Sequence, residues 1–260
     1  MNKIEIIAEA GINHCGENDL IKEMIHEAAK AGANCVKIQL YDPKVVFGDL
    51  PENKELFSEM EWEVIYKSRL TRRQLFWIKA ECERAGIELL SSVSDLERLQ
   101  WLEEIGIKRY KIASDDAMNE KLCRAIIAKG KSVLVSNGHL ELKRPKYLSG
   151  SAVEWLYCIS EYPNSLSSLR FIQENRSIFS FPTISYGEDN YYGYVGFSDH
   201  TIGINAAIVA MSLGARIIEK HFTLDKTLPG PDHVCSADPE ELRNLCEARN
   251  DVESILYKDQ

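Results

Sequence analysis

The sequence lacks the cysteine patterns of metal-finger and disulfide-rich proteins. It has seven cysteines, an odd number, and no two of them are spaced as CxxC. Widely spaced thiols of this kind indicate neither a zinc finger nor a disulfide framework. Reduced thiols in a cytoplasmic protein are the simplest interpretation. The cysteines are Cys15, Cys35, Cys82, Cys123, Cys158, Cys235 and Cys246.

Long apolar runs and an excess of basic charge are also missing. No apolar stretch approaches the roughly 18 residues needed to cross a bilayer. Glu5 and Glu9 interrupt the first apolar run, which makes it a poor signal peptide. The net charge of -9 argues against nucleic acid as the main partner, because a phosphate backbone demands a basic face. We therefore expect a cytoplasmic protein with no membrane or nucleic-acid partner.

What the sequence does contain is a regular alternation of β-rich and helical segments. Period-two and apolar runs predict strands over 4–12, 35–41, 87–93, 109–114, 132–138, 154–160, 191–198 and 216–222. Helical periodicity predicts helices over 19–33, 71–86, 96–106, 120–130, 167–179, 203–215 and 238–257. A long polar segment occupies 42–70. Gly32 suits a helix end, and Asp238 with Glu241 has the pattern of a capping box.

This alternation predicts right-handed βαβ units and a parallel sheet. Eight strands in 260 residues favour a (β/α)₈ TIM barrel that forms one domain over residues 1–260. Little room separates the strands 132–138 and 154–160, so the fifth helix should be short or missing. A doubly wound open sheet is the alternative fold. The turn after the first strand, GINHCGEN, matches neither GxGxxG nor a P-loop, which are common in that fold.

Every predicted strand ends in polar or ionisable residues, whereas the strand interiors are mainly Ile, Val and Leu. The active site of a TIM barrel lies at the carboxyl ends of its strands. We therefore expect these polar residues to meet at one mouth. In chain order they include Glu9, Asn13, His14, Lys37, Gln39, Ser91, Ser92, Lys111, Ser114, Asp115, Asp116, Ser136, Asn137, Ser160, Glu161, Tyr162, Ser198, Asp199, His200, Glu219, Lys220 and His221.

Two of these strand ends carry a histidine, in GFSDHTIG and in EKHFTLD. Ser198 shares a strand face with His200, and Glu219 shares one with His221. If both faces point inward, two imidazoles converge at one rim. With carboxylate and water ligands, they would suit a divalent ion such as Mn²⁺, Fe²⁺ or Zn²⁺. The alternative is a pair of unrelated structural histidines.

Lys37 and Lys111 would place two ammonium groups in the same pocket. An ion and two lysines that face inward predict an anionic ligand, such as a phosphate or a carboxylate. The alternative is that both lysines are ordinary solvated residues. Glu9 and Asp116 could also have structural roles instead of functional ones, since either side chain could cap a helix or pair with these lysines.

Six segments together resemble the sialic acid synthase family: IIAEAGINHCG, VKIQ, YKIAS, EYP, GFSDHTIG and EKHFTLDKTLPGPDHVCSADPEEL. The resemblance runs from Ile4 to about Leu242, and the two histidine-containing blocks are its most specific parts. Such enzymes condense phosphoenolpyruvate with N-acetylmannosamine or a related aldose to give a nine-carbon 2-keto acid. The resemblance implies a metal-dependent, carbon–carbon bond-forming transferase of sialic acid biosynthesis, with Mn²⁺ as the expected metal.

The resemblance also implies roles for individual residues. It implies that the metal ligands are His200 and His221. The implied catalytic groups are Glu9, Lys37, Lys111 and His200. The residues implied to hold phosphoenolpyruvate are Lys37, Ser92, Lys111, Ser114, Ser160 and Ser198. Those implied to contact the sugar are Gln39, Asp116, Tyr162 and Asp232.

Several positions depart from the family pattern. SSV replaces STP on the third strand, Asp115-Asp116 replaces Gly-Glu after the fourth, and Tyr157 replaces the histidine before Cys158. Family members usually continue into a C-terminal antifreeze-like domain, whereas for this chain we expect the catalytic barrel only. Two functional alternatives therefore stay open: condensation with a different aldehyde, and a non-catalytic barrel subunit. For the assembly, the alternatives are a homodimer and a separate partner that supplies the missing domain.

Overall fold

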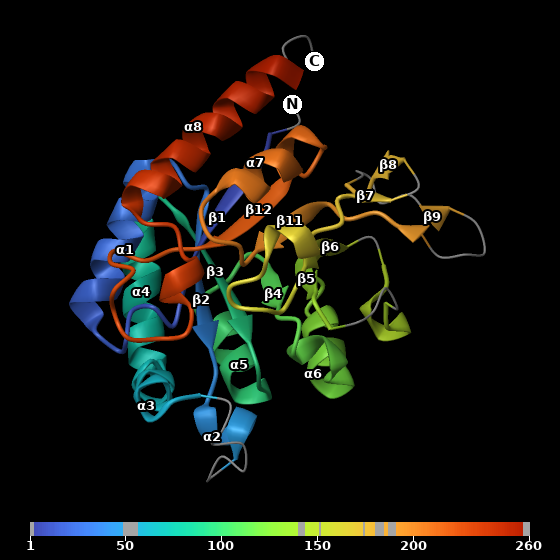
Figure 1. Cartoon of the computed structure of the whole chain (residues 1–260). Helices are drawn as coiled ribbons and strands as arrows, with labels where there is room; N and C mark the ends of the chain where they lie inside the picture. Colours follow the sequence, from blue (N-terminus) through green and yellow to red (C-terminus); the bar gives the residue numbers. More distant parts are fainter. Residues whose placement is uncertain are drawn as a thin grey trace.

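Eight parallel strands close into a barrel in the computed structural model of the chain (Figure 1). The structure describes residues 3–48, 57–139, 144–150, 152–173, 175–179, 185–186 and 191–256. Around the barrel each strand pairs with its neighbours in chain order, and the last pairs with the first. The predicted TIM barrel is confirmed and the open-sheet alternative is wrong. The barrel strands are β1 (Glu5–Gly11), β2 (Cys35–Leu40), β3 (Glu88–Val93), β4 (Tyr110–Ile112), β5 (Val133–Asn137), β6 (Val153–Cys158), β11 (Gly196–Asp199) and β12 (Ile217–His221).

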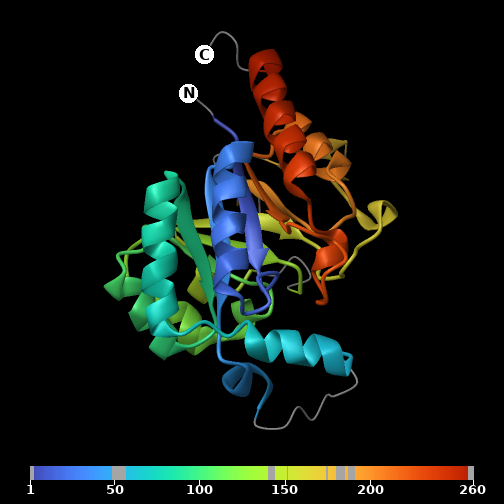
Figure 2. The same ribbon diagram turned by 90° about the vertical axis from the view of Figure 1, so that its left-hand side faces the viewer.

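Helices cover much of the outside of the barrel, and α1 lies between α4 and α8 (Figure 2). Their ends follow local sequence signals. Gly32 ends α1 with a φ of 92°, the left-handed conformation that favours glycine. The capping box predicted for α8 is confirmed, because the Glu241 amide donates to Asp238 Oδ1 at 2.9 Å and the Asp238 amide donates to Glu241 Oε2 at 3.1 Å. The covering helices are α1 (Asn18–Ala31), α4 (Arg72–Ala85), α5 (Leu96–Glu104), α6 (Glu120–Ile127), α7 (Asn205–Ser212) and α8 (Pro239–Leu256).

Within the described residues, no α-helix follows β5 or β6. After β5 the chain forms only the 3₁₀ turn Lys146–Leu148, in agreement with a short or missing fifth helix; residues 140–143 and 151 lie outside the described part. The helix predicted over 167–179 is wrong. In its place the chain forms the 3₁₀ turn Leu166–Ser168 and a hairpin of β7 (Ile172–Gln173) and β8 (Arg176–Ser177).

Aromatic packing explains why an extended segment replaces this helix. The Phe171 ring lies 5.8 Å from Tyr157 of β6 and 5.0 Å from Phe197 of β11, both measured between ring centroids. Phe179, at the far end of the segment, lies 5.2 Å from Phe171. Rings in edge-to-face contact at these distances stabilise the segment directly against the strands. The helical spacing of apolar residues in 167–179 is therefore overridden by tertiary contacts.

Only part of the segment 191–198, which was predicted to be one strand, belongs to the barrel. Only the part from Gly196 onward joins the barrel, as β11, while β10 (Tyr191–Tyr192) pairs with β9 (Ser185–Tyr186) in a separate antiparallel sheet. Gly196 is required where β11 meets β12, because a Cβ atom there would collide with the backbone of Ile217.

The polar segment 42–70 contains two helices that the sequence analysis did not predict, α2 (Pro43–Phe47) and α3 (Glu59–Lys67); residues 49–56 lie outside the described part. A capping box between Ser58 and Glu61 starts α3. Val64 and Ile65 of α3 then pack in a small hydrophobic cluster with residues of the β1 and β2 loops. The helix α3 therefore lies on the mouth side of the barrel, away from both chain ends (Figure 2).

The interior of the barrel is filled below its mouth by one apolar layer, consisting of Ile7, Cys35, Leu90, Leu134, Leu156, Val195 and Ile217. Because side chains alternate along a strand, the residue two positions further on also points inward, except after Val195, where Phe197 packs against Phe171 instead. On β1, β2 and β12 those residues are charged. The fold thus places ionisable groups directly above this apolar layer.

No described helix is long and apolar enough to cross a bilayer.

Candidate functional site

A pocket of about 330 Å³ opens at the carboxyl ends of the barrel strands. All eight barrel strands, or the loops that follow them directly, contribute side chains to it, as expected for the active-site end of a TIM barrel. The lining residues are Glu9, Lys37, Gln39, Ser92, Lys111, Ala113, Ser114, Ser136, Cys158, Tyr162, Ser198, His200, Glu219 and His221. The convergence predicted from the strand ends is therefore observed for twelve of the residues named, whereas others, such as Asn13, His14 and Asn137, lie outside the lining.

Three of the predicted site residues lie outside this lining: Asp116, Ser160 and Asp232. Ser160 is nevertheless close to it, because a Cβ atom at Gly138 would collide with the hydroxyls of both Ser160 and Ser114. The Gly138 amide donates to Ser114 Oγ at 3.1 Å. Gly138 is thus a position where the absence of a side chain makes room for two hydroxyls at the pocket edge.

The strand register explains why residues far apart in the sequence meet here. Glu9 of β1 lies level with Lys37 of β2 on one side and with His221 of β12 on the other. Ser92 of β3 is level with Lys111 of β4. Parallel strands in this register place their inward side chains at the same height in the barrel.

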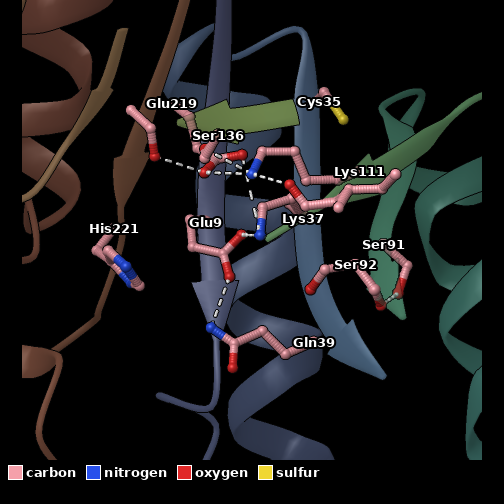
Figure 3. Close-up of polar contacts among 12 residues, drawn as sticks. Glu9, Cys35, Lys37, Gln39, Ser91, Ser92, Lys111, Ser136, Glu219 and His221 are labelled. Carbon is pink, nitrogen blue, oxygen red and sulfur yellow. Dashed lines mark hydrogen bonds and ion pairs between the residues drawn. The ribbon is translucent and has the colours of Figure 1, made fainter. Parts of the chain in front are cut away.

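Two ammonium and two carboxylate groups form the charged floor of the pocket (Figure 3). Lys37 Nζ lies 2.5 Å from Glu9 Oε2 and 3.9 Å from Glu219 Oε2. Lys111 Nζ lies 3.7 Å from Glu219 Oε1. All four side chains are almost fully buried. Their charges cancel, which lowers the cost of burying each of them.

Neutral hydrogen-bonding groups hold these charges in place. Lys111 Nζ donates to Ser136 Oγ at 2.7 Å and to the Ile112 carbonyl at 3.1 Å. Ser198 Oγ donates to Glu219 Oε1 at 2.8 Å. Gln39 Nε2 donates to Glu9 Oε1 at 3.2 Å, so the floor is connected to the next layer towards the mouth.

Burial and pairing shift the pKa values of this floor in different directions. Burial raises the pKa of Glu9 despite its pairing with Lys37. Burial also lowers the pKa of Lys111, although Glu219 opposes the shift. For Glu219, burial raises the pKa, but the ammonium groups of Lys111 and Lys37 outweigh it and the net shift is downward. Glu9 is therefore the floor carboxylate that takes up a proton more readily.

The two histidines of the sequence motifs lie side by side above this floor. The ring centroids of His200 and His221 are 5.4 Å apart, and the Tyr162 ring stacks on His200 at 4.0 Å. His200 Nδ1 lies 2.7 Å from the carbonyl of Ile159. Since a carbonyl only accepts, Nδ1 carries the proton and the lone pair is on Nε2. Burial lowers the pKa of His200 to about 4 and that of His221 well below its usual value, so both rings are neutral at neutral pH.

Two carboxyl groups lie at the edges of the pocket. Asp232 Oδ2 is 3.7 Å from His221 Nδ1, beyond hydrogen-bond range, and burial followed by the charge of Glu9 raises the pKa of Asp232 to about 7. Asp116 Oδ2 accepts a hydrogen bond from Ser94 Oγ at 2.9 Å. Burial raises the pKa of Asp116 to about 6.

Apart from Ala113, the lining residues to which the sequence analysis assigned no catalytic, metal-binding or substrate-binding role are Glu219, Ser136 and Cys158. The signal that could have found them is strand parity. Glu219 lies two residues before His221, and Ser136 and Cys158 each lie two residues after an inward leucine. Strand parity also distinguishes Asp199 and Lys220 from the pocket residues, because each is next in sequence to a histidine that lines the pocket and so belongs to the opposite face of its strand. Both have no exposed surface, they pair with each other at 3.2 Å, and neither lines the pocket.

Comparison with known proteins agrees with this geometry. The NeuB family matches residues 24–260 of the chain. The uncharacterized protein MJ1065 of Methanocaldococcus jannaschii is 36% identical over 260 residues, which are 96% of this chain and 71% of the relative. N,N'-diacetyllegionaminic acid synthase of Legionella pneumophila is 33% identical over 96% of this chain and 72% of the relative.

A solved structure agrees as well. The N-acetylneuraminic acid (sialic acid) synthetase of Leptospira borgpetersenii in complex with citrate superposes with a TM-score of 0.79 at 31% sequence identity. The superposition covers 99% of this chain and 86% of that one. The family match, the sequence relatives and the shared barrel lead to one conclusion: the chain belongs to the NeuB family, which includes sugar acid synthases.

Proposed function

We propose that the chain condenses phosphoenolpyruvate with an aldose, N-acetylmannosamine or a related sugar, to give a sialic acid-like 2-keto-3-deoxy sugar acid and phosphate. The observation that carries the proposal is the charged floor of two lysines beneath two neutral histidines in one pocket. The names of the Legionella relative and of the Leptospira synthetase support the same type of reaction.

The floor and its surrounding hydroxyls would hold the phosphate and carboxylate of phosphoenolpyruvate. Ammonium and hydroxyl groups are strong donors to such anions, and burial strengthens these interactions. Glu9 and Glu219 fix the positions of the two lysines, so little reorganisation accompanies binding. The hydroxyls that face or border the pocket belong to Ser92, Ser114, Ser136, Ser160 and Ser198.

His200 and His221 would hold a divalent metal ion, with Mn²⁺ as the proposed metal. The fit rests on the imidazoles: both are neutral, and the hydrogen bond to Ile159 leaves Nε2 of His200 with a free lone pair. In the described part of the chain, no group of three His, Cys, Asp or Glu side chains is arranged as a metal site. Water or substrate would therefore complete the coordination. The bound metal would supply Lewis acidity to the aldehyde oxygen.

The proposed reaction is balanced with one water molecule. A bond forms between C3 of phosphoenolpyruvate and the aldehyde carbon, whose oxygen becomes a hydroxyl. Water adds its oxygen to C2, and the bond between C2 and the phosphate oxygen breaks, which leaves a ketone and free phosphate. Glu9, a buried carboxylate with a raised pKa, is suited to orient this water and accept its proton.

The aldose would lie above the floor, where Gln39 and Tyr162 line the pocket and Asp116 and Asp232 border it. Tyr162 stacks on one histidine, so its ring forms a wall against which a sugar can pack. Three further expectations stay predictions: a single domain over residues 1–260, a cytoplasmic location, and a homodimer or a partner that completes the sugar site.

The test is consumption of phosphoenolpyruvate by the purified chain, with Mn²⁺ and a panel of aldoses. We expect consumption only when metal and a suitable aldose are both present, and none after EDTA treatment. Consumption without any aldose, or undiminished consumption in EDTA, would contradict the proposal. Phosphoenolpyruvate alone should also raise the melting temperature, because a ligand that binds only the folded state stabilises it.

A further inference from the structure

A thiol and an imidazole meet outside the pocket lining, where the loop after β1 contacts the loop after β12. Cys15 Sγ lies 3.7 Å from His233 Nε2. Cys15 is partly buried and has a φ of 51°, a left-handed conformation that is uncommon for residues other than glycine. His233 is buried and begins the 3₁₀ turn His233–Cys235. Neither side chain lines the pocket, and neither has a part in the proposed reaction.

The hydrogen bonds of Thr223 determine which nitrogen of His233 carries the proton. Thr223 Oγ1 donates to the carbonyl of Asp225 at 3.0 Å, and this bond uses the only hydroxyl proton. His233 Nδ1 lies 2.8 Å from the same oxygen, so Nδ1 is the donor in that contact. Nε2, the nitrogen that contacts Cys15, therefore carries the lone pair. Burial lowers the pKa of His233, so the ring is neutral at neutral pH.

The Cys15 sulfur has more acceptors around it than its one proton can serve. The carbonyl oxygens of Asn13 and Pro229 each lie 3.6 Å from Sγ, and His233 Nε2 is a third acceptor. A thiol donates to one such group at a time. A cation in place of the thiol proton would interact with all three acceptors and with the thiolate. The arrangement therefore indicates a metal ion.

The distances fit a tetrahedral zinc ion. Bonds of about 2.3 Å to sulfur and about 2.0–2.1 Å to nitrogen, at a tetrahedral angle, place the two ligand atoms about 3.5 Å apart. The observed separation of Cys15 Sγ and His233 Nε2 is 3.7 Å. Sulfur and oxygen ligands are about 3.6 Å apart in the same geometry, which matches the two carbonyls. These carbonyls or water would complete the coordination.

The charges near the thiol also favour a cation. Burial, followed by the charge of Glu17, raises the pKa of Cys15, so a carboxylate lies close enough to act on this sulfur. Lys67 of α3 opposes the shift, but its ammonium group is paired with Glu63 at 2.7 Å. A positive ion that replaces the thiol proton would gain from the carboxylate.

We propose that Cys15 and His233 bind a zinc ion that joins the loop after β1 to the loop after β12. The site is additional to the metal proposed at His200 and His221, and it does not depend on the proposed function. The donor sets differ, because thiolate sulfur selects Zn²⁺, whereas Mn²⁺ prefers oxygen ligands. Asp232 directly precedes His233 in the sequence, so zinc here would also hold the loop at one edge of the pocket.

The test is zinc calorimetry on the variant His200→Ala/His221→Ala, in which the two pocket histidines cannot compete for the ion. We expect one zinc ion per chain. Zinc binds the thiolate and displaces its proton, while the imidazole is already neutral. The affinity should therefore rise about tenfold for each pH unit between about pH 7 and about pH 8.

Matched variants in the same background identify the ligands. Cys15→Ser should lower the affinity at least about tenfold and remove its dependence on pH, because no thiol proton is displaced. Thr223→Val keeps both ligands but removes the hydrogen bond that orients the ring, and should weaken binding about tenfold or more. Cys246→Ser is the control, because Cys246 is a buried thiol on α8, and it should leave the affinity and its pH dependence unchanged.

Cobalt gives a second readout, because a thiolate bound to Co²⁺ produces a charge-transfer band in the near ultraviolet. The band should be present in the parent and absent in Cys15→Ser. The same comparison with both pocket histidines intact keeps the test valid if the double variant does not fold. Zinc affinity that Cys15→Ser leaves unchanged, or a parent without the band, would overturn the inference. The proposed function would be unaffected, since neither readout depends on turnover.

Discussion

The floor of the pocket and its rim are built in different ways. Floor groups lie on strands, are almost fully buried, and have charged or hydrogen-bonding partners within 2.5–3.9 Å. Rim groups lie on the loops that follow the strands, and the apolar ones, Tyr162, Leu166, Ile202 and Val234, are about half exposed. A buried charge without its partner is expensive, so the floor tolerates little change. Loops can vary without this penalty.

This contrast suggests a division of labour. The rigid floor would bind the part of the reaction that is common to the family, and the rim would select the aldose. The chain's departures from the family pattern fit this division. Asp115 and Asp116 lie at the mouth, whereas Glu9, Lys37 and Lys111 form the floor. Substitutions made separately in the floor and in the rim test this contrast.

The largest effect is expected for the histidines. His200→Ala and His221→Ala should each abolish metal-dependent turnover while the far-ultraviolet circular dichroism stays unchanged, since each removes one of two proposed ligands. Mn²⁺ affinity, measured by calorimetry, should fall in parallel. His26→Ala is the control, because His26 is exposed on α1 and is not among the residues that line the pocket. Full activity in either pocket variant would contradict the metal assignment.

The next effect concerns the floor lysines. Lys111→Met should lower kcat/KM for phosphoenolpyruvate about 10²–10³-fold, the range for loss of one preorganised charged donor. The double variant Asp199→Leu/Lys220→Met is the matched comparison, because it removes another buried ion pair that lies outside the pocket. It should change stability but not the KM for phosphoenolpyruvate. Equal effects of both variants on that KM would show that Lys111 acts only through stability.

A stability effect is expected at Asp116. Its pKa of about 6 in the folded chain exceeds the ordinary 3.8, so the folded state favours the protonated form. Its contribution to stability is full below pH 3.8 and is lost as the pH rises through 6. Asp116→Asn should therefore stabilise the protein by about 1–3 kcal/mol at about pH 8 and by little at about pH 4.

Urea unfolding at the two pH values measures this difference. Asp115→Asn is the control, because the Asp115 side chain is largely exposed. A gain for Asp116→Asn that is the same at both pH values would mean that ionisation of the carboxyl does not cause it.

The smallest effect is expected at the rim. Tyr162→Ala should raise the KM for the aldose by about tenfold or less, because it removes one packing surface. The KM for phosphoenolpyruvate should hardly change, since the floor is intact. Steady-state kinetics with each substrate varied in turn separates the two. A larger change in the KM for phosphoenolpyruvate than in that for the aldose would contradict the division between floor and rim.

Much of the floor could be predicted from the sequence, because strand periodicity determines which side chains point inward. Lys37 and Gln39, or Ser198 and His200, are pairs two residues apart that do line one pocket. Glu219 follows the same rule: it shares a strand face with His221, and both line the pocket. The register between strands could not be predicted from the sequence. Glu9 lies level with both Lys37 and His221 because of the way the barrel closes.

The segments outside the strands were harder to predict, for a physical reason. The apolar spacing of 167–179 resembles a helix, but contacts of Phe171 with Tyr157 and Phe197 hold it extended. The helix α3 lies in a segment that looked polar and gains its stability from a small cluster around Val64 and Ile65. In both cases tertiary contacts outweigh local propensity.

The most direct test of the account is the identity of the product. The chain is incubated with phosphoenolpyruvate, Mn²⁺ and the preferred aldose, and the product is analysed by mass spectrometry alongside free phosphate. The account predicts one new compound with the mass of the aldose plus pyruvic acid, and one phosphate for each phosphoenolpyruvate consumed. Free pyruvate and phosphate with the aldose unchanged would show simple hydrolysis and would contradict the assignment of the floor and the histidines to a carbon–carbon bond-forming site.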